Sequence, residues 1–438
     1  MLSAFSNSLR IPELRQRILF TFGIIFVCRL IAAVPTPGVD AVALREFMAM
    51  VRATAGGSFV GLFDLFSGGA LENCAVGALG VMPYISASII LQLMTAVVPA
   101  LERLAREGDT GRQKITQYTR YLTVLLCIVQ GYAMALTLEN PEALGITSAI
   151  VLFPGWGFRL LAIVTMTTGT LLLMWLGEQV TERGIGNGMS LIITIGIVSS
   201  MPSAIQAAIN MFKPIDGVMQ FSLFHLIGLL VMIFFVIASV IAVTQAQRKI
   251  PVQYAKRVVG RKVYGGQSTY MPLRVNYAGV MPIIFGQAIL MFPTKIFGML
   301  PGSFFQSLAS ALNYGTMTHF SYFWVATQFN PIQIADDLKK YGGYVPGIRP
   351  GKPTAEFLDR TMTRITLAGA VFLAVIAVIP TVMAQQFRIP WIVASFFGGT
   401  SMLITVGVML DTMRQIESHL VMRYYDGFLK KGRLRGRK

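Results

Sequence analysis

The chain has 438 residues, of which 54% are hydrophobic and only 13% are charged, and its formal net charge is +17. Soluble globular proteins typically carry about 25% charged residues, so this composition excludes an ordinary soluble domain and indicates a polytopic membrane protein. In such a protein, the positions of the positive charges matter more than their sum.

Ten apolar segments are long enough to cross a bilayer, because a hydrocarbon core of about 30 Å needs about 20 helical residues. Backbone groups must find internal hydrogen-bond partners in lipid, so these segments are predicted to be helices and the protein to be all-α. The predicted spans are 18–35, 74–97, 119–138, 157–177, 187–208, 220–244, 275–294, 314–330, 363–383 and 391–412. A shorter apolar segment, 59–72, is predicted to enter as a half-helix and to stop inside a funnel or pore.

Two of these spans contain a proline in similar surroundings. The second span reads ALGVMPYISASIILQLM with Pro83 inside it, and the seventh reads NYAGVMPIIFGQAI with Pro282 inside it. A proline inside a helix removes a backbone hydrogen bond and kinks the helix. We therefore expect two kinked helices, one in each half of the chain, that form a seam able to part.

Positive charges are distributed unevenly among the segments that connect the spans. With the N-terminus in the cytoplasm, 30 of the 37 Lys and Arg residues fall on the inner side, six fall on the outer side, and Arg29 lies within a span. This bias follows the positive-inside rule and predicts that both termini face the cytoplasm. A miscount of one span near the middle would scramble the bias, so the bias supports the count of ten.

Two long basic loops lie on the predicted inner face. In the loop 245–274, the alternation of apolar and polar residues around RVVGRKVY predicts a β-hairpin that turns near Gly260. The loop 331–364 contains GGYVPGIRPGKPTAEF, but Pro346 and Pro353 stand where a phosphate-binding loop needs a glycine and a hydroxyl residue. Both loops are longer than orientation requires, so we interpret them as a docking surface.

Ionisable residues are nearly absent from the span interiors, which disfavours ion-coupled transport. Arg29 lies near the outer end of its span and is predicted to snorkel to the interface. The main alternative is a secondary transporter with inverted repeats, and a second is a membrane scaffold that only recruits cytosolic proteins. The cysteines at 28, 74 and 127 and the three histidines are far apart, so no metal site, cofactor or catalytic cluster is predicted and the chain is not expected to be an enzyme.

Several long strings resemble the SecY family, the central subunit of the bacterial protein-conducting channel (the SecYEG translocon). They are FSGGALENCAVGALGVMPYISASIILQLMT, GRQKITQYTRY, GTLLLMWLGEQVTERGIGNGMS, PVQYAKRVVGRKVY, VPGIRPGKPTAEFLDRTMTRIT and FFGGTSMLITVGVMLD. The resemblance implies ten transmembrane helices in two inverted, pseudo-symmetric halves of five, an hourglass pore and a short plug helix. The N-terminal half is 1–208, with the plug at about 61–72, and the C-terminal half is 209–438, with the two basic loops and a basic tail at 413–438.

The resemblance also implies the function and its residues. Such a channel translocates unfolded secretory polypeptides and releases membrane helices sideways into the bacterial inner membrane. The pore ring would consist of Val81, Ile85, Met189, Ile193, Ile284 and Ile404. The plug would include Phe63, Leu65, Phe66, Gly68, Gly69 and Leu71, and the lateral gate would include Ser86, Ile89, Gln92 and Asn276.

The basic loops would then serve as the landing platform for the SecA motor and the ribosome. The docking residues implied are Arg248, Lys249, Lys256, Arg257 and Arg349. Ribosomal RNA is a polyanion, so its attraction to these loops should depend on salt. The resemblance adds the small subunits SecE and SecG, signal sequences, nascent chains and anionic phospholipids as partners, and extends to YidC and SecD/SecF.

The role of Arg349 gives a first testable prediction. Arg349→Glu reverses the charge on the loop that would meet the motor, so motor-driven translocation by reconstituted vesicles should fall to background. The variant should still insert into the membrane at the normal level. Normal translocation by this variant would refute the role of Arg349.

Overall fold

The structure is a computed structural model that describes residues 11–40, 42–44, 67–139, 150–213, 221, 223–254, 257–259, 262–264, 268–274, 331–387, 389–397 and 400–431. Its contacts divide the chain into two compact units. The first unit is Met1–Lys213 with Pro390–Phe396 and Ile404–Lys438, and the second is Pro214–Ile389 with Phe397–Leu403. Each unit is described by itself.

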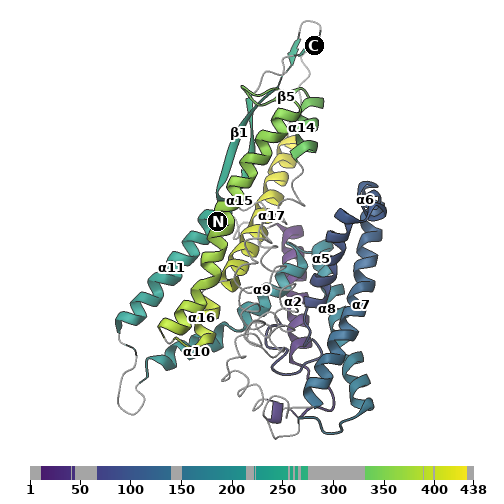
Figure 1. Ribbon diagram of the computed structural model, residues 1–438, viewed down its shortest axis with the longest axis vertical. Coiled ribbons are helices and arrows are strands. Elements are labelled where there is room, and N and C mark those ends of the chain that lie inside the picture. The colour runs from purple at the N-terminus through teal and green to yellow at the C-terminus, as the bar shows by residue number, and fades with distance from the viewer. Residues whose placement is uncertain are drawn as a thin grey trace, which may run out of the picture. The chain divides into compact units, whose positions relative to one another are not determined.

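The described part of the first unit consists of helices and turns, with two isolated β-bridges, Pro35↔Ala75 and Val39↔Val151. Its elements are α2 (Pro12–Ala33), α5 (Met82–Val97), α6 (Pro99–Arg106), α7 (Asp109–Glu139), α8 (Trp156–Arg183), α9 (Gly188–Ser199), α10 (Met201–Met211), α16 (Trp391–Phe397) and α17 (Thr400–Lys431). The last residue of α16 and the first four of α17 fall in the second unit. Helices α5, α7 and α8 lie side by side, with α2 and α9 against α8 (Figure 1).

Proline marks the beginning of four of these helices: α2, α5, α6 and α10. The first helical turn has no internal acceptor for its N–H groups, so proline costs nothing there and its fixed φ favours the helix. Pro83 is one of these residues, because α5 begins at Met82. The prediction that Pro83 kinks the middle of a span is therefore wrong, and Pro282 lies outside the described residues.

Residues 68–81 form turns, whereas the sequence pattern predicted the end of the half-helix 59–72 and the start of the second span, 74–97, in this region. Their backbone is nevertheless hydrogen-bonded: Thr36 N–H donates to Cys74 O at 2.9 Å and Val76 N–H donates to Val34 O at 2.8 Å. Short turns within the segment pair Ala75 with Ala70 and Gly80 with Gly77, each at 2.8 Å. The hydrophobic pattern could not predict these turns. An apolar run has the same sequence pattern whether its backbone hydrogen bonds close a helix or run to another segment of the chain.

Ion pairs join α7 and α8 near both ends. Arg120 donates two hydrogen bonds to the carboxylate of Glu178, at 3.1 and 2.7 Å. At the other end, Arg159 Nε donates to the buried carboxylate of Glu139 at 2.7 Å and also lies over the Trp156 ring. The Arg120–Glu178 pair is two-pronged, a geometry that makes it stronger than an ordinary surface ion pair. The other oxygen of Glu139 accepts the Gly155 N–H at 2.8 Å.

The turn 184–188 between α8 and α9 ties four helices together. Its sequence, GIGNG, lacks the spacing of a dinucleotide-binding motif, and its N–H groups bind side chains of the protein instead. The bonds run from Ile185 to Thr21 Oγ1, from Gly186 to Gln415 Oε1 and from Gly188 to Thr181 Oγ1, and Asn187 Oδ1 caps α9 at Ser190. Leu14, Ile18, Ile185 and Ile416 pack together beside it.

The second unit combines apolar helices with a small sheet. Its elements are α11 (Leu223–Gln245), β1 (Gln247–Tyr254), β2 (Arg257–Val259), β3 (Lys262–Tyr264), β4 (Ser268–Arg274), α14 (Pro331–Lys340), β5 (Gly343–Tyr344) and α15 (Lys352–Gln386). β1 pairs with β4 from Gln247↔Arg274 to Gln253↔Ser268, and β2 pairs with β3, so the predicted hairpin is confirmed. β5 adds a third strand through Gln253↔Tyr344, which joins the two basic loops into one sheet.

Five helices of the described part are long and apolar enough to cross a membrane, and the bent pair α5–α6 raises the number to six. They correspond to the first six predicted spans, and α15, α16 and α17 cover the last two. The predicted spans 275–294 and 314–330 lie outside the described residues, so the count of ten stays a prediction. Large apolar side chains are exposed along these helices, for example Phe26, Val164 and Phe234, as a lipid-facing surface requires.

The close contact of α8 with the segment 68–81 gives a prediction about stability. A Cβ at Gly169 would lie 2.6 Å from the carbonyl carbon of Val76, so Gly169→Ala must push two backbones apart. We expect a loss of about 1–3 kcal/mol, measured as a lower Tm of the purified protein in detergent.

Gly157→Ala in the same helix is the matched control, because a Cβ there meets nothing within 4 Å. It should be neutral or stabilise the protein by up to about 1 kcal/mol through helix propensity. Equal Tm values for the two variants would contradict the packing described above.

Candidate functional site

Four of the six residues predicted for the pore ring are buried in the first unit. Val81, Ile85, Ile193 and Ile404 expose at most 5% of their surface. Val81 immediately precedes α5, and its carbonyl oxygen accepts the N–H of Ile85 at 3.1 Å, so these two side chains follow one another along the helix start. Burial is a condition that a closed apolar seal must meet.

The other two ring positions differ from these four. Met189 is half-buried, and a Cβ at Gly177 would lie 2.7 Å from its sulfur, so Met189 packs over the backbone of α8. Ile284 lies outside the described residues. The ring of six as a whole therefore stays a prediction.

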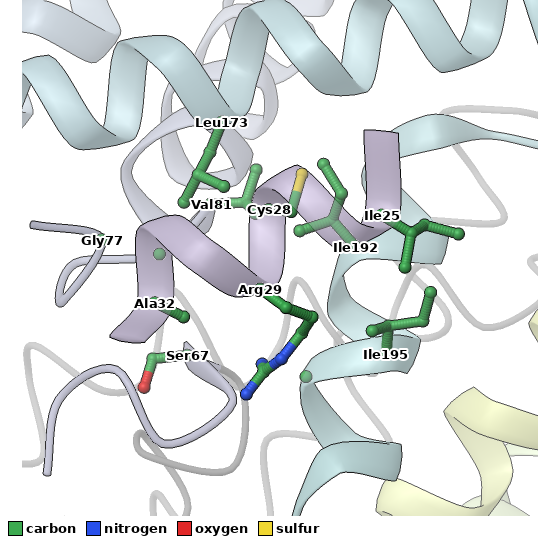
Figure 2. A pocket seen from close by; sticks show the side chains of 12 residues that line it. Ile25, Cys28, Arg29, Ala32, Ser67, Gly77, Val81, Leu173, Ile192 and Ile195 are labelled. Carbon is green, nitrogen blue, oxygen red and sulfur yellow. The ribbon is translucent and has the colours of Figure 1, made fainter. Parts of the chain in front are cut away.

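A small cavity opens beside Val81, between α2, α8, α9 and the segment 68–81 (Figure 2). It measures about 20 Å³, room for about one water molecule, so it is not itself a path for a polypeptide. Most of its lining is apolar or glycine, with Arg29 and Ser67 as the polar members. Helix α9 contributes Ile192, Ile195 and Gly196 to the lining. These residues neighbour Ile193, which is predicted to belong to the pore ring.

Three of the predicted plug residues are described: Gly68, Gly69 and Leu71. The chain is in turns from Gly68 onward, with φ of +70° at Gly68 and +84° at Gly69, so the predicted plug helix does not extend to residue 72. Only glycine adopts such φ values readily, which explains the doubled glycine. Leu71 is buried, and Phe63, Leu65 and Phe66 lie outside the described residues.

Arg29 does not snorkel, so that prediction is wrong. Its side chain is half-buried in the bundle, and Nη2 donates to the carbonyl oxygen of Gly68 at 2.8 Å. Figure 2 shows the guanidinium reaching from α2 toward the loop that carries Ser67. The bond was not predicted because Gly68 lies 39 positions away in the chain. The signal that could have indicated it was a single arginine inside an apolar span, since such residues usually have a function.

The predicted lateral-gate residues on α5 form one stripe. Ser86 and Ile89 are buried and Gln92 is half-buried, and steps of three residues place them on the same side of a helix. In the described part, α5 packs against α7 and α8. Asn276 lies outside the described residues, so the gate between the two halves stays a prediction.

The predicted docking residues lie on a surface with its own hydrophobic core. Arg248, Lys249 and Arg349 are exposed, Arg257 lies in β2, and Lys256 is outside the described residues. Beneath Arg248, Lys249 and Arg349 lies a buried cluster of Ile250, Leu273, Val345, Leu358, Met362 and Ile365. This core joins the sheet to α15.

The segment 342–351, here called the docking loop, is fixed in several ways. Glycines 342, 347 and 351 have φ of +71°, +82° and +98°. Thr354 Oγ1 donates to the carbonyl oxygen of Arg349 at 2.8 Å, and Ile348 N–H donates to Val345 O at 3.1 Å. A rigid loop presents Arg349 with less entropy to lose on binding.

Comparison with known proteins decides the family. Residues 75–413 match the SecY family model. The chain is 45% identical over 450 residues to "Protein translocase subunit SecY" of Streptomyces coelicolor, covering 98% of this chain and 100% of that protein. It is also 45% identical over 454 residues to the protein of the same name from Thermus thermophilus, covering 100% of both.

The chain belongs to the SecY family. SecY proteins are translocase subunits and not enzymes, which agrees with the absence of a predicted catalytic cluster. Among the described residues, no group of three or more His, Cys, Asp or Glu side chains could hold a metal ion.

Solved structures show that the fold is also that of SecY channels. The structure described as "The structure of a protein conducting channel" superposes with a TM-score of 0.56 at 17% identity, covering 92% of each chain. "Sec61 in the Canine ribosome-channel complex from the endoplasmic reticulum" gives 0.53 at 16% identity with the same coverage. The chain therefore shares the multi-pass helical fold of these structures.

The core beneath the docking loop of this SecY chain gives a prediction. Leu358 is completely buried in that cluster, so Leu358→Ala should cost about 2–5 kcal/mol and loosen the loop. Amide hydrogen exchange across 342–351 should become faster than in the wild type.

Leu367→Ala, at an exposed position of the same helix, is the matched control and should leave that exchange unchanged. Faster exchange in both variants, or in neither, would show that the core does not hold the loop.

Proposed function

We propose that this chain is the channel-forming subunit of a bacterial protein translocase. The observation that carries the proposal is the match, over the whole chain, to proteins named as translocase subunits. The chain would pass unfolded secretory polypeptides across the inner membrane and release membrane helices sideways into the lipid. Both termini would face the cytoplasm, as the charge bias requires.

The proposed pore works by mechanical yielding and needs no chemical step. Val81, Ile85, Met189, Ile193, Ile284 and Ile404 would form a ring of apolar side chains that gives way to a passing chain and closes behind it. Apolar constrictions resist wetting, which limits ion leak. Hydrogen-bonding groups at this level would instead hold the passing polypeptide. The burial of the four described residues in the first unit supports this proposal.

The plug and the lateral gate complete the proposed channel. The plug, at about 61–72, would block the pore from the outer side, and one solved relative bears the description "The plug domain of the SecY protein stablizes the closed state of the translocation channel and maintains a membrane seal". The gate would lie between the halves 1–208 and 209–438, with Gln92 and Asn276 as polar contacts. Polar contacts between membrane helices are worth about 1 kcal/mol, weak enough for a signal sequence to replace them.

The energy source would be external, because the sequence contains no nucleotide-binding motif. The exposed Arg248, Lys249 and Arg349, with Lys256 and Arg257, would bind the SecA motor and the ribosome. A solved relative is a channel bound to a ribosome, and the sheet that joins both basic loops offers one continuous support for such contacts. SecE, SecG, YidC, SecD/SecF and anionic phospholipids are the further partners proposed.

Site-specific crosslinking tests the proposed function. A photoreactive amino acid at Ile85 should crosslink a secretory chain that is stalled during translocation in inverted membrane vesicles. The same group at Leu160, which is exposed on α8, is the control and should react with lipid only. A scaffold or a small-solute transporter would give no crosslink at position 85, and that result would overturn the proposal.

A further inference from the structure

Gly68 is held by groups from two helices. Its carbonyl oxygen accepts a hydrogen bond from Arg29 of α2 at 2.8 Å and a longer one from Ser199 Oγ of α9 at 3.3 Å. A Cβ at Gly68 would meet the Arg29 guanidinium and would lie 2.6 Å from the Cα of Gly196. The backbone of residue 68 therefore lies directly on α9, beneath the arginine side chain.

The chain beyond Gly68 is held by a different set of contacts. Ala70, Cys74, Ala75 and Ala78 are completely buried. The strand-like contact of Pro35 with Ala75 and the bonds from Thr36 and Val76 fix this part to the end of α2. The fixed segment thus includes the last residues of the predicted plug, 61–72, and Gly68 lies between it and the part of the plug that precedes it, where Arg29 binds.

The bond from Arg29 has the properties of a strong contact. A hydrogen bond from a charged donor is about twice as strong as one between neutral groups. Its surroundings increase that strength, because the neighbouring cavity is lined by Ile25, Val81, Leu173 and other apolar groups (Figure 2).

From these contacts we propose that Arg29 is a positioning residue that holds the C-terminal end of the plug in the closed channel. The arginine makes no contact with the passing chain in this role. It sets how readily the plug leaves, because opening must first break its bond to Gly68. The inference rests on the proposed function, since it needs the segment before Gly68 to act as a plug.

The test measures ion leak through the complete complex in vesicles, by iodide efflux without a translocating chain. Arg29→Met keeps an unbranched apolar stem but removes the donors of the side chain, so the leak should rise about tenfold. Arg29→Lys retains a charged donor and should restore most of the seal. A general packing defect would not be rescued in this way.

Deleting residues 61–71 distinguishes the role of the Arg29–Gly68 contact from the role of the plug itself. The deletion should itself raise the leak, and Arg29→Met should add nothing to it, because the acceptor is already gone. If the deletion raises the leak but Arg29→Met alone does not, Arg29 does not hold the plug, although the plug itself seals the channel. If the deletion leaves the leak unchanged, the sealing role in the proposed function is wrong. If Arg29→Met adds leak to the deletion, Arg29 acts elsewhere and the inference is overturned.

Glycine substitutions keep the inference testable if Arg29→Met fails to fold. Gly68→Ala and Gly69→Ala impose similar backbone strain, since φ is +70° and +84°, but only the Cβ at 68 meets neighbours. The leak should therefore rise more in Gly68→Ala. Ser199→Ala should raise it slightly, whereas Ser203→Ala, which removes a bond within its own helix, should not. Equal leak in the two glycine variants would show that the packing of residue 68 on α9 does not control the seal, and would overturn the inference.

Discussion

The need to hydrogen-bond every backbone group away from water governs the first unit. Residues 68–81 leave the helical conformation beside the middle of α8, where Val76 meets Gly169. Unpaired N–H and C=O groups are costly in such surroundings. The segment therefore forms hydrogen bonds within its own turns, to the end of α2 and to the side chains of Arg29 and Ser199. This arrangement allows an irregular segment to exist among membrane helices.

Small residues allow this irregular segment to lie close to the helices. Gly68, Gly169 and Gly188 let backbones approach at distances that a Cβ would prevent, and Gly68 also has a φ that other residues avoid. Close approach is how membrane helices associate without a hydrophobic driving force between them. The first unit therefore combines tight contacts at glycines with a few polar bonds, and Gly68 lies among them.

The second unit holds charged residues at an exposed surface. Its sheet and the docking loop project highly charged residues, and a hydrophobic cluster beneath them keeps their backbone in place. Arg349 is exposed, while the carbonyl of the same residue is fixed by Thr354. A surface that binds a partner benefits from this combination, because rigidity lowers the entropy lost on docking.

The sequence by itself determined the membrane class, six of the spans, the hairpin around RVVGRKVY and the family, because hydropathy, alternation and long motifs are local properties of the chain. It also indicated the apolar residues Val81, Ile85, Ile193 and Ile404, whose burial the structure shows. Only the tertiary structure decided that Pro83 begins a helix, that 68–81 is not helical, and that β5 joins the two basic loops. It also decided that Arg29 turns inward to Gly68. These features depend on partners distant in the chain, and local patterns carry no information about which distant group will satisfy a backbone oxygen or a buried charge.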